Sequence, residues 1–320
     1  MKMLSVVYSM VVFWSLQASA FEIGAHRGMY PPLEPGYKPG AQDCTAEHID
    51  DPSVRSSEIR YILENTLLAI SKAFEMHADR ASINLQLTGD EEVVLFHDKK
   101  LDCKTDRTGF IRDYDLKDLK TFNMGAGYQF DGAYPWRETR IIKQGYTEIT
   151  TLDELMAVHP DRAYWIVVRP KDAEELAAIL RKIKPYSQAV EKSLLFVPVE
   201  QPWVKETIAR ELPEIAIPRI DPARNRLCQK SVVPGQDLSV SCHNLELILQ
   251  VEDALALGPH LQELGERLHE VNSHLVIGTD LGGFVETVEQ AKALLPYTSV
   301  IDGMMTNRID LIGPFFHNQD

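Results

Sequence analysis

The sequence lacks an excess of basic residues and, beyond its N-terminus, any long hydrophobic run. It has 33 Lys and Arg against 47 Asp and Glu, a net charge of −14. Nucleic-acid binding relies on basic side chains that neutralise phosphates, so this charge argues against a nucleic-acid partner. Since no internal stretch is apolar and long enough to cross a bilayer, we expect no transmembrane span in the mature chain. No internal repeat is present, and 44% apolar with 25% charged residues is typical of a globular protein.

Cysteine is also scarce, and the four cysteines are Cys44, Cys103, Cys228 and Cys242. None belongs to a CxxC pair, which argues against a zinc site. Four cysteines allow three pairings, and free buried thiols are the alternative. We favour a Cys228–Cys242 disulfide, because it closes a short loop rich in Pro, Gly and Ser. This choice leaves Cys44 to pair with Cys103.

The N-terminus has the pattern of a secretory signal. Lys2 is followed by an apolar stretch from Leu4 to Leu16, and an A-x-A cleavage motif ends at Ala20. An uncleaved membrane anchor is the alternative, although the stretch is short for a span. We therefore predict a signal peptide over residues 1–20, a mature chain that begins at Phe21, and a secreted or periplasmic location, where disulfides form.

The mature sequence alternates short β-type runs with helical runs. Apolar residues recur with helical spacing over residues 63–74, 176–183 and 284–295. This alternation indicates a parallel β/α architecture, and about eight strands suit a (β/α)8 barrel better than an open sheet. The expected strands are 22–26, 82–87, 93–97, 164–168, 194–199, 215–220, 274–278 and 300–305, and 245–251 is either a ninth strand or part of a helix.

Charged and polar motifs follow the ends of these strands. The first strand ends in His26-Arg27-Gly28, the third ends in His97-Asp98, and Glu64-Asn65-Thr66 opens the first long helix. Chemistry in a (β/α)8 barrel lies at the carboxyl ends of the strands. We therefore expect two histidines, an arginine and a glutamate to converge on one rim.

These motifs, in this order and spacing, resemble the glycerophosphodiester phosphodiesterase family. The resemblance continues through the Thr105–Gly109 loop, the Ile149–Leu155 segment and the last strand at Ile301–Arg308, so it spans about residues 22–312. It implies a TIM barrel of the phosphatidylinositol-phospholipase-C-like phosphodiesterase type. Residues 21–320 would form a single domain, with an inserted loop at about 29–60 between the first strand and the first helix.

The resemblance also implies a reaction and its residues. The family hydrolyses glycerophosphodiesters to sn-glycerol 3-phosphate and an alcohol, assisted by a divalent cation, often calcium or magnesium. By motif, His26 and His97 would be the acid–base pair and Arg27 would bind the phosphate. Glu64 would orient that arginine. Arg169 stands where the family has a substrate-side lysine.

The family's metal-binding carboxylates are the main departure. The family has Glu-x-Asp on the second strand, fifteen residues before the second histidine, and this chain has Ser82 and Asn84 there. The third ligand, a Glu on the fourth strand, is replaced by Val167. Calcium and magnesium require anionic oxygen ligands, so we expect no cofactor at these positions and weak or absent activity with either ion. A relocated cage is the alternative, and its candidate ligands are Glu200, Asp221 and Asp280.

Three functions therefore remain open at the level of sequence. The first is an exported phosphodiesterase with His/His acid–base chemistry and impaired or altered metal dependence, acting on a small-molecule phosphodiester. The second is a catalytically inactive pseudoenzyme that binds a phosphodiester, a lipid headgroup or a protein partner. The third is a purely structural or protein-interaction barrel.

Overall fold

A computed structural model describes residues 21–29, 62–102, 104–125, 148–198, 201–218, 220–232, 237–278 and 283–319. The predicted signal peptide, nearly all of the predicted inserted loop, Cys44 and Cys103 lie outside these ranges. Among the described residues, no helix combines the length and the apolar character that a membrane crossing requires.

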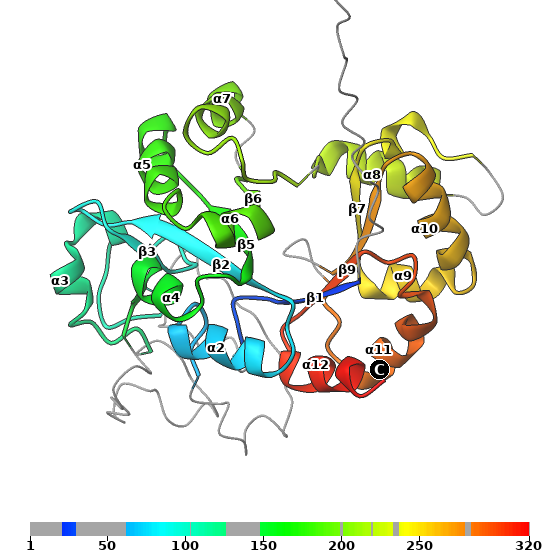
Figure 1. Cartoon of the computed structure of the whole chain (residues 1–320), viewed down its shortest axis with the longest axis horizontal. Coiled ribbons are helices and arrows are strands. Elements are labelled where there is room, and N and C mark those ends of the chain that lie inside the picture. Colours follow the sequence, from blue (N-terminus) through cyan, green and yellow to red (C-terminus); the bar gives the residue numbers. More distant parts are fainter. Residues whose placement is uncertain are drawn as a thin grey trace, which may run out of the picture.

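The strands form one sheet around which the helices are arranged (Figure 1). Its strands are β1 (Glu22–Ala25), β2 (Arg80–Leu87), β3 (Val93–Leu95), β4 (Thr150–Thr151), β5 (Ala163–Val168), β6 (Leu194–Phe196), β7 (Glu246–Leu249), β8 (His274–Ile277) and β9 (Gly303–Thr306). The parallel strands follow the order β6-β5-β2-β1-β9-β8-β7, and β3 and β4 add antiparallel pairs beside β2.

Most of the parallel strands are connected through helices, as the sequence periodicity predicts. The helices are α2 (Leu67–Glu75), α3 (Leu116–Leu119), α4 (Leu152–Val158), α5 (Ala173–Ile183), α6 (Ser187–Lys192), α7 (Pro202–Glu211), α8 (Pro222–Ser231), α9 (Val251–Leu257), α10 (His260–Glu270), α11 (Val288–Leu294) and α12 (Ile309–His317). The helical run predicted over 284–295 is shorter in the structure, because Thr287 caps α11 by accepting a hydrogen bond from the Gln290 backbone N–H.

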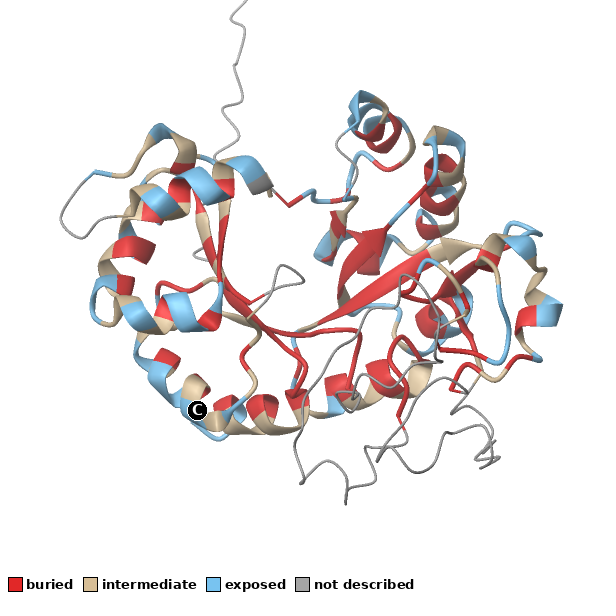
Figure 2. Cartoon of the chain, turned by 180° about the vertical axis from the view of Figure 1, so that it is seen from behind, coloured by how far each residue is buried: buried red, intermediate tan, exposed pale blue. Residues whose placement is uncertain are grey.

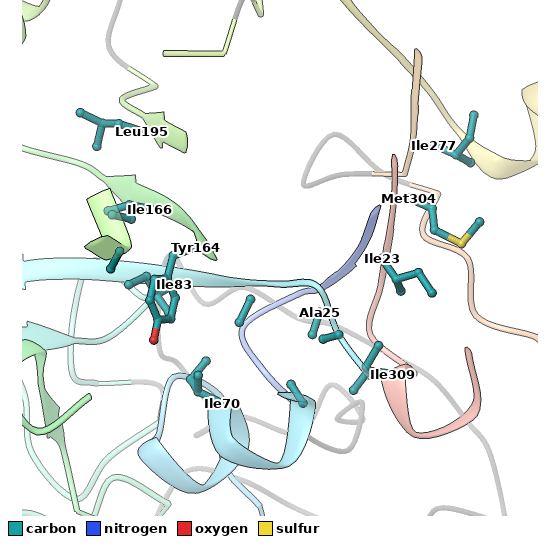
Figure 3. Close-up of a cluster of buried hydrophobic side chains, with 14 of the residues drawn as sticks. Ile23, Ala25, Ile70, Ile83, Tyr164, Ile166, Leu195, Ile277, Met304 and Ile309 are labelled. Carbon is teal, nitrogen blue, oxygen red and sulfur yellow. The ribbon is translucent and has the colours of Figure 1, made fainter. Parts of the chain in front are cut away.

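The main core lies between the sheet and the helices. In β5, Tyr164, Ile166 and Val168 belong to this core, whereas Trp165 and Val167 belong to a smaller apolar cluster on the other face of the strand. Figure 2 shows the strands buried and the outer faces of the helices exposed. Figure 3 shows the main core, with labelled side chains from the strands facing those from α2 and α12.

Two predicted strands differ from expectation. Residues 215–220 were expected to form a barrel strand, but among the described residues they contribute a single parallel bridge, Leu194 to Ala216. The ambiguous segment 245–251 forms strand β7. Strand β3 exists as predicted, but it runs antiparallel to β2 and forms a hairpin with it, so β3 is not one of the parallel barrel strands.

The hairpin determines where His97 lies. Strand β1 pairs with the start of β2, at Arg80 and Ala81, and β3 pairs with the end of β2, where Leu85 lies opposite Leu95. Since β5 occupies the other edge of β2, β1 and β3 share one edge. Strand β3 therefore runs back toward the carboxyl end of β1, and the residues that follow the two strands approach each other.

The disulfide favoured by the sequence is confirmed. Cys228 on α8 is bonded to Cys242, with a Cα–Cα distance of 4.9 Å, and both residues are fully buried. The bond ties α8 to the segment that leads into β7. The second predicted pair, Cys44–Cys103, lies outside the described residues.

Candidate active site

The turn after β1 has a backbone that few residues adopt. Arg27 and Gly28 have φ values of 55° and 92°. A Cβ on Gly28 would lie 2.7 Å from the backbone carbon of Ala69 in α2, so this position requires glycine. The Asn65 N–H donates to the Arg27 carbonyl at 3.0 Å, and the Met29 N–H donates to the Ala69 carbonyl at 2.8 Å. These bonds fix His26 and Arg27 against the start of α2.

The inward-facing residues of β2 support this turn. The Ser82 hydroxyl accepts a hydrogen bond from the Arg27 backbone N–H at 3.2 Å. The Asn65 side-chain oxygen accepts from the Asn84 backbone N–H at 2.9 Å. The Asn84 side-chain oxygen accepts from the Arg169 guanidinium at 3.1 Å. Side chains of β2 therefore contact both Arg27, which follows β1, and Arg169, which follows β5 and is exposed.

A chain of buried charges extends from Arg27. Its guanidinium donates to Glu64 Oε2 at 3.0 Å, and the Lys104 ammonium donates to Glu64 Oε1. The same ammonium lies 3.1 Å from Asp98 Oδ1. Burial alone would raise the pKa of Glu64, but the charges of Lys104 and Arg27 outweigh it and hold this pKa well below its usual range. The pKa of Asp98 is likewise lowered, because Lys104 and His97 outweigh the effect of burial. Both carboxyls are therefore ionised at neutral pH.

His97 is held as a neutral imidazole. Burial, together with the nearby charges of Arg27 and Lys104, lowers its pKa to about 4, and the bond to Asp98 offsets this only in part. Its Nδ1 lies 2.9 Å from Asp98 Oδ1. Since an ionised carboxylate can only accept, Nδ1 carries the proton and Nε2 has the lone pair. A neutral histidine with this tautomer can act as a general base at Nε2.

His26 is held by a different set of partners. Its Nδ1 lies 2.7 Å from Asn307 Oδ1, and its ring stacks on Phe284 with centroids 4.6 Å apart. The Asn307 amide nitrogen donates to Glu286 Oε1 at 2.8 Å, which turns the amide oxygen toward His26. Nδ1 of His26 is therefore the donor in this contact.

Every site residue predicted from sequence lies at the carboxyl end of the parallel strands or in the hairpin beside them. His26 and Arg27 follow β1, Arg169 follows β5, and His97 follows β3. Glu64 precedes α2 and pairs with Arg27, as the resemblance implies. The roles assigned to these residues stay predictions.

Comparison with protein families and curated sequences identifies relatives. Residues 55–197 match the model of the glycerophosphoryl diester phosphodiesterase family. The chain is 33% identical over 132 residues to a glycerophosphodiester phosphodiesterase of Bacillus subtilis, a match that covers 39% of this chain and 43% of that protein. It is 29% identical over 85 residues to glycerophosphodiester phosphodiesterase 1 of Mus musculus, covering 27% of this chain and 26% of that protein. The chain thus spans less than half the length of these relatives.

Solved structures extend the likeness to nearly the whole chain. A glycerophosphodiester phosphodiesterase from Agrobacterium tumefaciens has a TM-score of 0.56 at 16% identity, over 92% of this chain and 99% of that one. The chain is similar to the glycerophosphoryl diester phosphodiesterase family in sequence over residues 55–197 and in fold over nearly its whole length. A phosphodiesterase of Oleispira antarctica, solved with the product sn-glycerol-3-phosphate, has a TM-score of 0.55 at 18% identity, covering 92% of this chain and 96% of that one. These neighbours confirm the (β/α)8 fold.

The expectation that this chain holds no set of metal ligands is not supported. Within the described part of the chain, Glu64, His97 and Asp98 form a buried group whose potential ligand atoms lie within 4.8 Å of one another. The sequence prediction did not assemble this group, because it assigned Glu64 and His97 other roles. Of the relocated ligands it proposed, Asp221 accepts a hydrogen bond from the Arg224 backbone N–H as the cap of α8, and Glu200 and Asp280 lie outside the described residues.

The residues of this group do not fit a divalent cation as they stand. Both carboxylates already bind the Lys104 ammonium, and Asp98 Oδ1 also binds His97. At the three positions where the resemblance implies carboxylates, Val167 lies in an apolar cluster, and the Ser82 and Asn84 oxygens accept hydrogen bonds from protein donors. Calcium and magnesium need several free oxygen ligands, which neither set of residues offers.

Asp98, Lys104, Asn307 and Glu286 are site residues to which sequence reasoning gave no role. Lys104 gives no sequence signal of its role, because lysine in a polar loop is usually exposed. Asn307 does carry one, since it directly follows a predicted strand that pairs with the His26 strand. The contact of Glu286 with Asn307 could not be predicted from sequence, because it depends on how the loop before α11 packs beside β9.

Proposed function

We propose that the chain is an exported phosphodiesterase that cleaves glycerophosphodiesters or related lipid-derived phosphodiesters by histidine acid–base chemistry. The observation that carries this proposal is the chain of buried contacts that runs from Arg27, next to His26 after β1, through Glu64 and Lys104 to the His97–Asp98 pair after β3. Similarity to the family supports the substrate class, and the Oleispira relative binds sn-glycerol-3-phosphate. The altered metal dependence is part of the proposal, because the family's carboxylate positions are filled by neutral residues.

The two histidines suit complementary roles. A hydroxyl group, from the glycerol moiety or from water, attacks phosphorus and transfers its proton to Nε2 of His97. As the bond from phosphorus to the alcohol oxygen breaks, His26 gives that oxygen a proton, and solvent exchange then restores both histidines. Arg27 supplies positive charge to the phosphate oxygens, and Glu64 holds the guanidinium in place. Attack by the glycerol hydroxyl yields a cyclic phosphate before water opens it.

Export is supported by two observations. The N-terminal sequence has the order of a signal peptide, and the buried Cys228–Cys242 disulfide suits an oxidising compartment. Expression of the full chain in a secreting host, followed by N-terminal sequencing, tests this part. A mature chain that begins at Phe21 is expected, and retention of Met1 would contradict it.

Activity is tested by release of glycerol 3-phosphate from glycerophosphocholine, glycerophosphoethanolamine and glycerophosphoglycerol. We expect turnover by the wild type, and a loss of at least about 100-fold for His97→Gln and for His26→Gln, the scale of general acid–base catalysis. His260→Gln is the matched control, because its side chain is 54% exposed and lies on α10, outside the proposed site. Saturable substrate binding without turnover would instead support the pseudoenzyme.

A further inference from the structure

We infer that the ammonium group of Lys104 takes the place of a divalent cation in the carboxylate cluster of this site. The inference concerns the cation requirement of the proposed phosphodiesterase, and only that consequence rests on the proposed function. The identity of the cation in the cluster is a property of the folded chain and can be measured without substrate.

The position of the ammonium carries the inference. Within the part of the chain that the structure describes, the side chains grouped closely enough to ligate one metal are Glu64, His97 and Asp98. Lys104 Nζ donates to a Glu64 oxygen and lies 3.1 Å from the Asp98 oxygen that also contacts His97. The lysine therefore binds both carboxylates of the group. Its side chain is only 2% exposed, so this is not a surface ion pair that exchanges readily with solvent ions.

Among the described residues, the charges of the cluster balance without a metal. Two carboxylates, Glu64 and Asp98, face two cations, Arg27 and Lys104, and His97 lies among them as a neutral ring. A divalent ion added to this group would leave a net double positive charge in a buried environment. Uncompensated buried charge is strongly unfavourable, so a metal would have to displace the lysine first.

The loop that carries Lys104 is fixed by its own hydrogen bonds. The Leu101 N–H donates to the Gly109 carbonyl at 2.8 Å, and the Thr105 N–H donates to the Leu101 carbonyl at 3.0 Å. Asp102 accepts from the Gly109 N–H at 2.9 Å, which closes the loop again. These bonds bracket Lys104 on both sides. The ammonium is therefore held in place by the backbone, and displacement would require this loop to open.

The consequence is a site whose metal affinity depends on one side chain. Replacing Lys104 by methionine keeps a long unbranched side chain, one atom shorter, and removes its charge, which leaves the described cluster with a net negative charge. Such a cluster of two carboxylates and a histidine has the donor types of a manganese or calcium site. The lysine thus determines whether the cluster binds a divalent ion.

The test is isothermal titration of the purified mature protein with Mn²⁺ and with Ca²⁺ alone, without substrate. We expect no saturable binding to the wild type below about 1 mM, the weak end of protein calcium sites. Lys104→Met should gain one Mn²⁺ site at least about tenfold tighter than the wild type, and adding Glu64→Gln should abolish it. Lys72→Met is the matched control, because it removes a lysine paired with Glu75 on the exposed face of α2.

Two results would overturn the inference. One is saturable, stoichiometric Mn²⁺ or Ca²⁺ binding to the wild type that Glu64→Gln abolishes, which decides the matter even if Lys104→Met does not fold. The other is a folded Lys104→Met protein with no gain in affinity over Lys72→Met. In the activity assay, turnover by the wild type should be unchanged by EDTA, whereas an inactive wild type would count against the proposed function and leave the binding result intact.

Discussion

Protonation of His97 should destabilise the folded protein, and the size of the effect can be worked out. The pKa of this histidine falls from 6.5, its ordinary value, to about 4 in the folded state. Because the folded pKa is the lower one, the unfolded chain binds the proton first as the pH falls. Stability is therefore unaffected above about pH 7, and it is lost as the pH falls from about 6.5 to about 4.

The magnitude follows from the shift. Each pKa unit corresponds to about 1.4 kcal/mol, so the full change from 6.5 to about 4 amounts to about 3 kcal/mol of unfolding free energy. The perturbation that isolates this term is His97→Gln, whose amide can still donate to Asp98 but cannot titrate. Glu64 and Asp98, whose pKa values are lowered, lose their stabilising contributions mainly at lower pH, and both proteins retain them.

The assay is urea unfolding followed by the fluorescence of buried tryptophan, at about pH 7.5 and about pH 4.5. The wild type should lose at least about 2 kcal/mol more between these pH values than His97→Gln. The variant is expected to be less stable than the wild type at pH 7.5 and to approach it at pH 4.5. Trp165, at 8% exposure in β5, makes the fluorescence sensitive to unfolding of the sheet.

Parallel stability curves for the two proteins would refute this reasoning. They would mean that His97 has the same pKa in the folded and unfolded chains, and so is not held as a neutral base. The assignment of His97 as the proton acceptor would then fail as well, because that role depends on the neutral form at neutral pH. An NMR titration of the His97 ring provides the direct check.

Three further predictions concern stability. Glu64→Gln should lower the unfolding free energy by about 3–5 kcal/mol, because it leaves two buried cations without their shared carboxylate. The double variant with Lys104→Met should lose less than the sum of the two single changes. Additive losses in urea unfolding would contradict the pairing. Gly28→Ala should cost more than about 1 kcal/mol, since its φ is 92° and α2 leaves no room for a Cβ; an unchanged melting temperature would argue against the turn as described. Replacing both Cys228 and Cys242 by serine should lower the unfolding free energy by about 3 kcal/mol, the scale for a disulfide that closes a loop of this length. Oxidised and reduced wild type that unfold at the same urea concentration would contradict this prediction.

Much of the fold could be predicted from the periodic spacing of apolar residues along the sequence. The alternation in β2 and β5 places one set of side chains against the helices and the other set inward, and the structure confirms both strands. Direction is a different matter, because a run such as Val93–Leu95 has the same pattern whether it runs parallel or antiparallel to its neighbour. The apolar run at 215–220 shows that hydrophobicity alone does not predict strand pairing, because its described residues contribute only the bridge from Ala216 to Leu194.

The site could be predicted as far as motifs carried it. His26, Arg27, Glu64 and His97 were identified by order and spacing, and the structure brings them to one region. The buried position of Lys104 could not be predicted, because it depends on the fold of a loop and on two carboxylates that are distant from each other in sequence. Side-chain type indicates what a residue can do, whereas only the fold decides which charges it faces.

The β2–β3 hairpin gives the spacing of the two histidines an unusual kind of control. His26 follows β1, which pairs with the start of β2, and His97 follows β3, which pairs with the end of β2. The register of these two pairings along β2 therefore sets the distance between the two histidines. A slip of β3 by one residue would turn His97 to the opposite face of the sheet, whereas a slip by two would keep its face and move it along the edge. A change of hairpin length by an odd number of residues would therefore remove His97 from the site, whereas a change by an even number would shift its position within the site.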